Sequence, residues 1–337
     1  MGELTSRYIK KQRDYSQLNE RPPFPRILKI DVCNICNYSC IFCPQAKHVG
    51  KKGNIDEELC MKIIEDAYYA GAREICLSST GEPLLNKKLP EYIRFSKKMG
   101  YEYIFFNTNG LLMAEKLGED LLISGVDSVK FSINGAEKYY ELVHGVDSYQ
   151  TVIDNLKCFD MLRKNLKSPC KLYVSYVATK YTYDEADKVK TDTEQYCDEI
   201  MVMNANNRGG VVDEVDNELY LGDDEFSYQF PCSQIFNNAY VTSEGYLVAC
   251  CQDFENNMVM ADLNKMSISD AWNCDRFVAF RGKFLKHEFE GLLCDNCLNG
   301  THNPITPIDY DKAGYQHSDI RRNYIKERIE KLSNMWR

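Results

Sequence analysis

The chain has 337 residues, of which 44% are hydrophobic, and it carries a formal net charge of −9 at pH 7. This length suits one large domain or one and a half, and the acidic balance argues against a general affinity for nucleic acid. No apolar run is long enough to span a membrane, and the polar N-terminus lacks the apolar region of a secretory signal. The sequence therefore predicts a cytoplasmic protein without membrane contact.

From residue 26 to about residue 205, short apolar segments alternate with amphipathic ones. The apolar segments predict strands over 26–32, 75–80, 103–109, 128–134, 171–179 and 199–205. The amphipathic segments predict helices over 56–70, 89–99, 112–124, 149–165 and 183–196. This α/β order indicates a partial (β/α)6 TIM-like barrel, with an active site at the C-terminal ends of its strands.

The pattern changes after residue 210. Gly209, Gly210 and the acidic stretch 213–224 predict a linker. Segments 238–242 and 246–250 alternate around a turn and predict a hairpin, and 269–285 predicts a helix. We therefore predict an N-terminal extension over 1–25, the barrel over 26–210, a small α+β domain over 211–300 and a helical tail over 301–337.

Three cysteines follow the first predicted strand at the spacing C-x3-C-x2-C, namely Cys36, Cys40 and Cys43. In a chain without an export signal, clustered cysteines indicate a metal site rather than disulfides. Thiolates normally cap all the irons of a [4Fe–4S] cluster, so three ligands leave one iron open, and an open position is typical of catalytic metals. Three buried cysteines, or a zinc site that lacks one ligand, are the alternatives.

A second cysteine set lies in the C-terminal part. Cys232 and Cys250 are joined by the pattern C-x12-G-x4-C, and Cys294 and Cys297 form a C-x2-C pair. Four cysteines can ligate a cluster completely, and such a cluster handles electrons rather than binding substrate. A structural zinc site with the same four ligands is the alternative.

The two sets resemble those of radical S-adenosylmethionine (SAM) enzymes with a SPASM/Twitch-type auxiliary-cluster domain, and the resemblance covers roughly residues 26–300. It implies two [4Fe–4S] clusters, one that binds SAM and one auxiliary cluster. In that superfamily one electron, here expected from reduced flavodoxin or ferredoxin, lets the first cluster cleave SAM to a 5′-deoxyadenosyl radical. No cysteine follows Cys297, so the resemblance implies the shorter Twitch-like form with a single auxiliary cluster.

The same resemblance implies the residues that bind SAM. Residues 80–83, Thr-Gly-Glu-Pro, are similar to the superfamily's GGEP motif, in which the Glu accepts hydrogen bonds from the SAM ammonium. Such a pairing is chemically sound because a carboxylate attracts the cation and Gly lets the backbone approach. His144 stands where an Arg often holds the SAM carboxylate, which puts that clamp in doubt. The implied cofactor-binding residues are Phe42, Thr80, Gly81, Glu82, Asn109, Ser132 and His144.

For the reaction, the resemblance implies hydrogen abstraction from a carbon of a polyhydroxylated small molecule, a sugar or an aminocyclitol, followed by oxidation to a carbonyl. Enzymes of this layout include 2-deoxy-scyllo-inosamine dehydrogenase, aminoglycoside epimerases and anaerobic sulfatase-maturating enzymes. Epimerisation and modification of a peptide side chain are therefore alternatives. The stretch before Cys36 leaves no room for a leader-binding domain, which favours a small molecule.

Cys251 and Asp253, which follow the second predicted hairpin strand, bear on the choice between these reactions. Strand alternation predicts that Cys250 and Cys251 point to opposite faces, and a loop distortion could turn Cys251 toward the barrel mouth. There it could give a hydrogen atom to a substrate radical, whereas the alternatives are a core cysteine or a cluster ligand. Asp253 could accept the proton of an oxidation.

A function of a different class is that of a maturase or electron-transfer partner of another protein, acting through the C-terminal helix. The complete set of SAM-binding residues argues for the enzyme instead. By position alone, the candidates for substrate contact are Tyr173, Ser175, Asn206, Asn207, Arg208, Gln252 and Asp253.

Overall fold

The computed structural model describes residues 2–4, 6–7, 14–46, 51–212, 214–220, 230–313 and 319–336. A nine-stranded sheet in the order β6-β5-β4-β3-β2-β1-β7-β8-β9 organises the molecule. Its first six strands are parallel and follow the chain in sequence. They are β1 (Ile27–Ile30), β2 (Glu74–Cys76), β3 (Tyr103–Thr108), β4 (Ser128–Ser132), β5 (Lys171–Ala178) and β6 (Glu199–Asn204).

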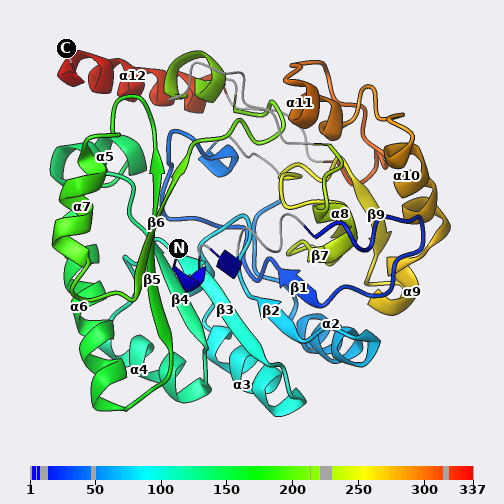
Figure 1. Cartoon of the computed structure of the whole chain (residues 1–337), viewed down its shortest axis with the longest axis horizontal. Helices are drawn as coiled ribbons and strands as arrows, with labels where there is room; N and C mark the ends of the chain where they lie inside the picture. Colours follow the sequence, from blue (N-terminus) through cyan, green and yellow to red (C-terminus); the bar gives the residue numbers. More distant parts are fainter. Residues whose placement is uncertain are drawn as a thin grey trace.

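Helices on the outside of these strands complete the predicted partial barrel (Figure 1). They are α2 (Glu57–Ala70), α3 (Leu89–Met99), α4 (Glu115–Ser124), α6 (Tyr149–Asn165) and α7 (Glu185–Thr193). Their ends follow local rules: the Asp56 side chain accepts from the backbone N–H of Leu59 at the start of α2, and Gly71 follows its last residue. An additional short helix, α5 (Glu137–His144), was not predicted.

The interior of the barrel is set by the alternation of side chains along the strands. Buried and partly buried residues alternate through β3 from Tyr103 to Thr108. The N-terminal residues lie at the opposite end from the cysteine loop, because Leu4 donates to Glu199 and Arg7 pairs with Glu74 at the starts of β6 and β2. The open end is therefore the one formed by the C-terminal ends of the strands, where the predicted site lies.

The C-terminal part extends the barrel sheet instead of forming a separate one. After α8 (Gln234–Asn237), β7 (Asn238–Val241) pairs in parallel with β1, and the antiparallel strands β8 (Tyr246–Val248) and β9 (Val259–Asp262) follow it. The predicted hairpin is confirmed as β7 and β8. The boundary predicted near residue 210 therefore marks a change in connectivity, and the sheet continues across it.

One prediction for this part is wrong. The helix predicted over 269–285 is two helices, α9 (Ile268–Trp272) and α10 (Asp275–Leu285). Cys274 between them has an extended backbone, and the buried Arg281 guanidinium donates to the Trp272 carbonyl at the end of α9. The linker predicted over 209–224 lies partly outside the described residues, and its described part contains a short π-helix, Val215–Leu219, whose two end residues are buried.

Two more helices complete the fold, α11 (Leu293–Asn299) and α12 (Asp319–Trp336). Helix α12 packs on α5, and its Ile325, Ile329 and Leu332 share an apolar cluster with Ile41 and Phe42 of the cysteine loop. This face of α12 is therefore covered by the protein itself. No helix in the described ranges is long and apolar enough to cross a membrane.

Candidate functional site

The first cysteine set lies in the loop between β1 and α2, at the open end of the barrel. The three thiols are neighbours, because the charge of Cys43 acts on both Cys36 and Cys40, and Cys36 acts on Cys40 as well. Burial raises the pKa of Cys36 to about 12 and also raises the pKa of Cys40. A cation bound between these thiols offsets that cost, so the donor set fits a cluster with one open iron.

His144 contacts this loop through the sulfur of Cys40. Its Nδ1 lies 3.2 Å from the Cys40 sulfur, and its Nε2 accepts from the backbone N–H of Asn134 at 3.1 Å. The ring is buried against the Tyr38 and Tyr140 rings. With both nitrogens engaged, His144 positions Cys40 in this structure and does not face open space as a carboxylate clamp.

The segment Thr80-Gly81-Glu82 follows β2 and packs directly on the backbone that leads into the cysteine loop. A Cβ on Gly81 would lie 2.2 Å from the carbonyl oxygen of Cys33, so only glycine allows this approach. The next N–H, that of Glu82, donates to the Ile35 carbonyl at 2.8 Å. The motif and the cysteine loop are thus fixed to one another.

Glu82 is a buried carboxylate that fits a cationic ligand. Its oxygens accept from the Thr108 hydroxyl at 2.7 Å, the Asn109 N–H at 2.7 Å and the Leu84 N–H at 3.0 Å. Burial raises its pKa to about 7, and no Lys, Arg or His of the described ranges pairs with it. A carboxylate has about four acceptor positions, so one is still available to the SAM ammonium.

The structure also places the other residues that the resemblance implied for SAM binding. The Asn109 side chain donates to the Asn37 side chain at 2.8 Å, next to the first cysteine. The Ser132 hydroxyl lies 3.5 Å from that of Ser175 on the neighbouring strand. Phe42 is buried in the apolar cluster beneath α12. SAM binding by these side chains remains our proposal.

The second cysteine set comes together from three separate elements. Cys232 precedes α8, Cys250 follows β8, and Cys294 and Cys297 lie on α11. Their thiols interact electrostatically: Cys232 acts on Cys250, on Cys294 and on Cys297. Burial raises the pKa of Cys232 to about 11, so this set also fits a bound cluster. In the described part of the chain, no three His, Cys, Asp or Glu side chains are arranged to hold a single metal ion.

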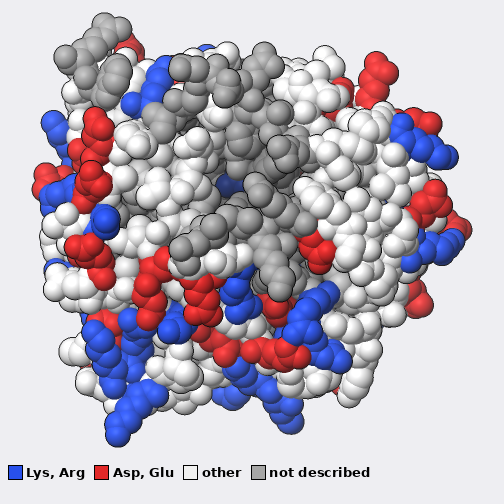
Figure 2. Space-filling model, in the orientation of Figure 1, with Lys and Arg blue, Asp and Glu red and all other residues white. Residues whose placement is uncertain are grey.

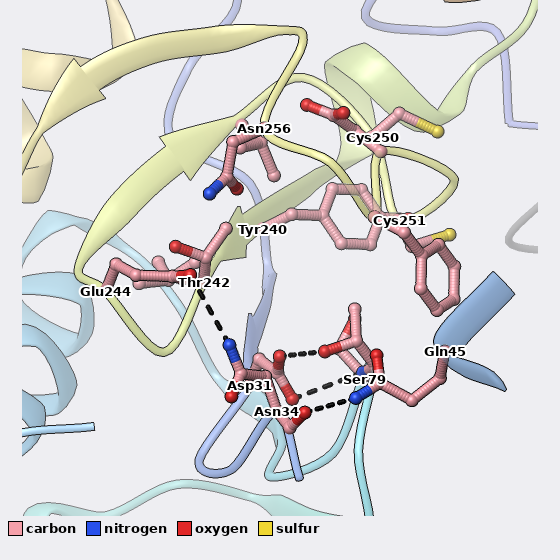
Figure 3. A pocket seen from close by; sticks show the side chains of 15 residues that line it. Asp31, Asn34, Gln45, Ser79, Tyr240, Thr242, Glu244, Cys250, Cys251 and Asn256 are labelled. Carbon is pink, nitrogen blue, oxygen red and sulfur yellow. Dashed lines mark hydrogen bonds between the residues drawn. The ribbon is translucent and has the colours of Figure 1, made fainter. Parts of the chain in front are cut away.

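Cys251 belongs with this set, and the prediction that it points away from Cys250 is wrong. Strand β8 ends at Val248, so the alternation of side chains no longer applies at these two cysteines. The Cys251 thiol interacts with Cys250, Cys232 and Cys297, and Figure 3 shows the sulfurs of Cys250 and Cys251 on the same side. The hydrogen bond with Cys250 lowers the pKa of Cys251, and Lys29 and Arg208 lower it further.

A cavity lies between the ends of the barrel strands and the C-terminal domain (Figure 3). Asp31, Ser79 and Thr80 line it from the barrel, and Cys250 and Cys251 line it from the auxiliary side. In this cavity, groups beside the SAM motif and groups of the auxiliary set therefore share a wall.

Asp253 lines the same cavity but is tied to the backbone. Its two oxygens accept from the N–H groups of Asn257 at 2.8 Å and Met258 at 2.7 Å, and burial raises its pKa to about 6. These bonds close the turn after β8, so Asp253 has a structural task that the sequence did not reveal.

Asp31 is the cavity residue that sequence reasoning missed. It directly follows β1, is 3% exposed, and accepts hydrogen bonds from the hydroxyl and the N–H of Thr80. Burial raises its pKa to about 7, in the range that suits a proton acceptor. Two features of the sequence could have indicated Asp31: it lies near the end of a predicted strand, and it lies two residues after Lys29, so that alternation puts both side chains on the inward side.

The fold and the two thiol sets define the class of the protein. Residues 30–189 match the radical SAM superfamily, and residues 232–298 match the iron–sulfur cluster-binding domain called SPASM. The chain therefore carries a radical SAM domain followed by a SPASM-type domain, and its cofactors are SAM and [4Fe–4S] clusters that include an auxiliary one.

Particular relatives agree with this class. The S-adenosyl-L-methionine-dependent 2-deoxy-scyllo-inosamine dehydrogenase of Niallia circulans is 26% identical over 295 residues, which cover 84% of this chain and 97% of that protein. The crystal structure of BtrN in complex with AdoMet and 2-DOIA has a TM-score of 0.55 at 22% identity, over 86% of this chain and 98% of BtrN. SuiB of Streptococcus suis, bound to the precursor peptide SuiA, has a TM-score of 0.61 at 15% identity, over 81% and 68%. The two solved structures support the fold alone.

Proposed function

We propose that the protein is a radical SAM dehydrogenase that oxidises a secondary alcohol of a polyhydroxylated small molecule, a sugar or a cyclitol, to a carbonyl. The observation that carries this proposal is the residues that line the cavity. Asp31 and Thr80 line it from the barrel, and Cys250 and Cys251 line it from the auxiliary side. The similarity to the dehydrogenase of Niallia circulans along nearly the whole of that protein supports it.

Oxidation of the alcohol removes a hydrogen atom from carbon, a proton from oxygen and one electron. When bound, SAM and the two clusters supply the acceptor for the hydrogen atom and the acceptor for the electron. The protein supplies the acceptor for the proton, and Asp31 suits this task better than Asp253. Both carboxylates are buried and accept hydrogen bonds from backbone N–H groups. Burial raises the pKa of Asp31 to about 7 and that of Asp253 to about 6, so Asp31 is the stronger base.

Glu82 and Thr80 have a separate task in this scheme. Glu82 binds the ammonium of SAM, and the Gly81 backbone keeps that carboxylate next to the cysteine loop. Thr80 links the two parts, because its hydroxyl and N–H donate to Asp31. A substrate in the cavity is thus placed between the SAM side and the auxiliary side.

Epimerisation is a second candidate, favoured by the place of one thiol. Cys251 lines the cavity, and a thiol there can return a hydrogen atom to the face of the substrate opposite the one that lost it. The product then keeps its hydroxyl, and the sulfur must afterwards be reduced by an external electron and proton, as ferredoxin or flavodoxin can provide.

The test uses the reconstituted protein with dithionite, SAM and polyols that carry deuterium on each carbinol carbon. We expect deuterium in 5′-deoxyadenosine and a ketone product, whereas an epimerase would return an inverted alcohol that has lost the deuterium of one carbinol carbon. The Cys251→Ala variant separates the two candidates, because it leaves a dehydrogenase almost unchanged but stops an epimerase from forming its inverted product. SAM cleavage stimulated by peptides and never by polyols would contradict both.

A further inference from the structure

Three basic side chains lie close together on the inward side of the barrel strands. Lys29 lies on β1, Lys130 lies on β4, and Arg208 follows β6. Strand alternation places Lys29 on the same side as Asp31 and Lys130 on the same side as Ser132, which is the inward side. The charges of Lys29 and Arg208 both act on Lys130, so the three lie close together although they come from distant parts of the chain. Figure 2 shows basic atoms deep in a hollow near the middle of this face.

These cations lack acidic partners in the described ranges. The Lys29 ammonium donates to the Tyr240 hydroxyl at 3.4 Å, and Arg208 donates to the Gln252 side chain at 3.3 Å. None of the described carboxylates pairs with either of them or with Lys130. Burial, together with the two neighbouring cations, lowers the pKa of Lys130 to about 8. All three side chains are half-buried, and a cation partly withdrawn from water without an anion beside it is unfavourable. Such groups are found where a ligand supplies the counter-charge.

The cofactors account for part of this charge only. Arg208 acts on Cys251 and Cys297, so the negative auxiliary cluster offsets its charge. Lys29 acts on Cys251, but the described neighbours of Lys130 include no cysteine of either ligand set. The remaining charge that acts on Lys130 is that of Cys76, which belongs to neither set. Lys130 therefore has a positive charge that neither cluster accounts for.

We propose that Lys29 and Lys130, with Arg208 beside them, form a subsite for an anionic group of the substrate, a carboxylate or a phosphate. The subsite adjoins the cavity, because two residues that line the cavity interact with its cations. Tyr240 contacts Lys29, and the charges of Lys29 and Arg208 act on Cys251. This inference rests on the proposed function and narrows its substrate to a polyhydroxylated acid or a phosphorylated polyol.

The test measures binding, without turnover, to the reconstituted protein with SAM present. Calorimetry compares D-glucuronate and D-glucose 6-phosphate, each against D-glucose, and inorganic phosphate as the simplest probe. We expect at least one anionic sugar to bind about tenfold or more tightly than glucose, the size of effect that one charge-assisted contact gives. Preference for glucuronate or for the phosphates shows which anion the subsite takes.

Variants then assign the preference to Lys130. Lys130→Met should remove about tenfold of the anion affinity and leave glucose binding unchanged, and Lys130→Arg should restore part of it. Lys171→Met, which removes an exposed lysine of the adjacent strand β5, is the matched control and should change nothing. The SAM affinity of Lys130→Met should also stay within about twofold of the original, because the subsite takes the substrate.

Two results overturn the proposal. In one, the anionic probes bind no better than glucose, or none of them binds saturably. In the other, Lys130→Met loses SAM affinity, which would assign this lysine to the SAM carboxylate. Failure of the proposed function has a different signature, since the anions would then bind as expected while no polyol is oxidised.

Discussion

At the scale of single residues, the site depends on two carboxylates that burial has brought close to neutral pH. Asp31 and Glu82 are both almost fully buried, and burial raises the pKa of each to about 7. They differ in their surroundings, because Asp31 lines the cavity, whereas Glu82 is outside that lining and accepts from the Thr108 hydroxyl. One is therefore suited to take a proton from substrate, and the other to bind a cation.

Changing Asp31 to Asn should abolish the proton acceptor and keep its size. We expect oxidation of the substrate to fall by about 100-fold or more, within the range usual for a general base, while SAM affinity changes little. In the unmodified enzyme, kcat/KM should rise with pH through about 7, because the base works only when ionised. Asp253→Asn is the comparison, and if it removes this pH dependence while Asp31→Asn does not, the assignment of the base is wrong.

Changing Glu82 to Gln should weaken SAM binding by about tenfold or more, because a neutral amide replaces the carboxylate that we propose pairs with the SAM ammonium. The iron content should stay the same, since Glu82 is not a cluster ligand. Equilibrium binding of SAM to the reconstituted, unreduced protein measures this. Unaltered affinity would show that the segment from Thr80 to Pro83 does not bind the ammonium.

At the scale of elements, α12 is the structural support of the first cysteine loop. Three of its apolar residues pack on Ile41 and Phe42, and the buried Arg328 donates to the Ser39 carbonyl within the loop. These contacts join the end of the chain to a segment far away in sequence. The loop's thiols therefore depend on α12 for their positions, because Cys40 and Cys43 pack against the same apolar cluster.

Truncating Ile329 to Ala should loosen this contact and cost about 2–5 kcal/mol of packing at a fully buried site. We expect the SAM-binding cluster to lose iron to a chelator several times faster, and the auxiliary cluster to be retained. EPR of the reduced protein with and without SAM distinguishes the two clusters. Lys331→Ala, at an exposed position of the same helix, should behave like the unmodified protein, and equal losses in both variants would contradict this role of α12.

At the scale of the whole molecule, the barrel and the C-terminal domain share one sheet. Strand β7 covers the edge that β1 would otherwise expose, and the Trp272 indole donates to the Pro22 carbonyl of the segment that leads into β1. An uncovered strand edge invites aggregation, so this pairing protects the barrel as well as placing Cys232 and Cys250 near it. Strand pairing thereby fixes where Cys250, after β8, lies relative to the cysteine loop that follows β1.

Two clusters per molecule predict about eight irons per chain after anaerobic reconstitution. The combined change of Cys36, Cys40 and Cys43 to Ala should leave about half of the iron and no SAM cleavage. Cys158→Ala, outside both sets, should keep all of it. Iron and zinc analysis with sulfide determination provides the measurement, and four irons or bound zinc in the unmodified protein would contradict the prediction.

The alternation of strands and helices, the barrel and both cysteine sets followed from the sequence alone. Helices α3 and α6 begin and end where their amphipathic pattern predicted, because helix formation responds to neighbours three and four residues apart. The cysteine spacings were equally local, since each set is recognised within a few residues or by a hairpin pattern. For these features the information lies in adjacent residues.

Other features depended on contacts between distant segments, and the sequence could not supply them. The pairing of β7 with β1, the position of Cys251 beside Cys250 and the packing of α12 on the cysteine loop each join residues that local patterns treat separately. The same holds for Lys29 and Lys130. In the sequence they are single lysines of two separate strands, and only the folded barrel places both on its inward side. Sequence determined which cofactor chemistry this protein carries, and tertiary structure decided which charges surround the cavity, because only folding brings the ends of separate strands together.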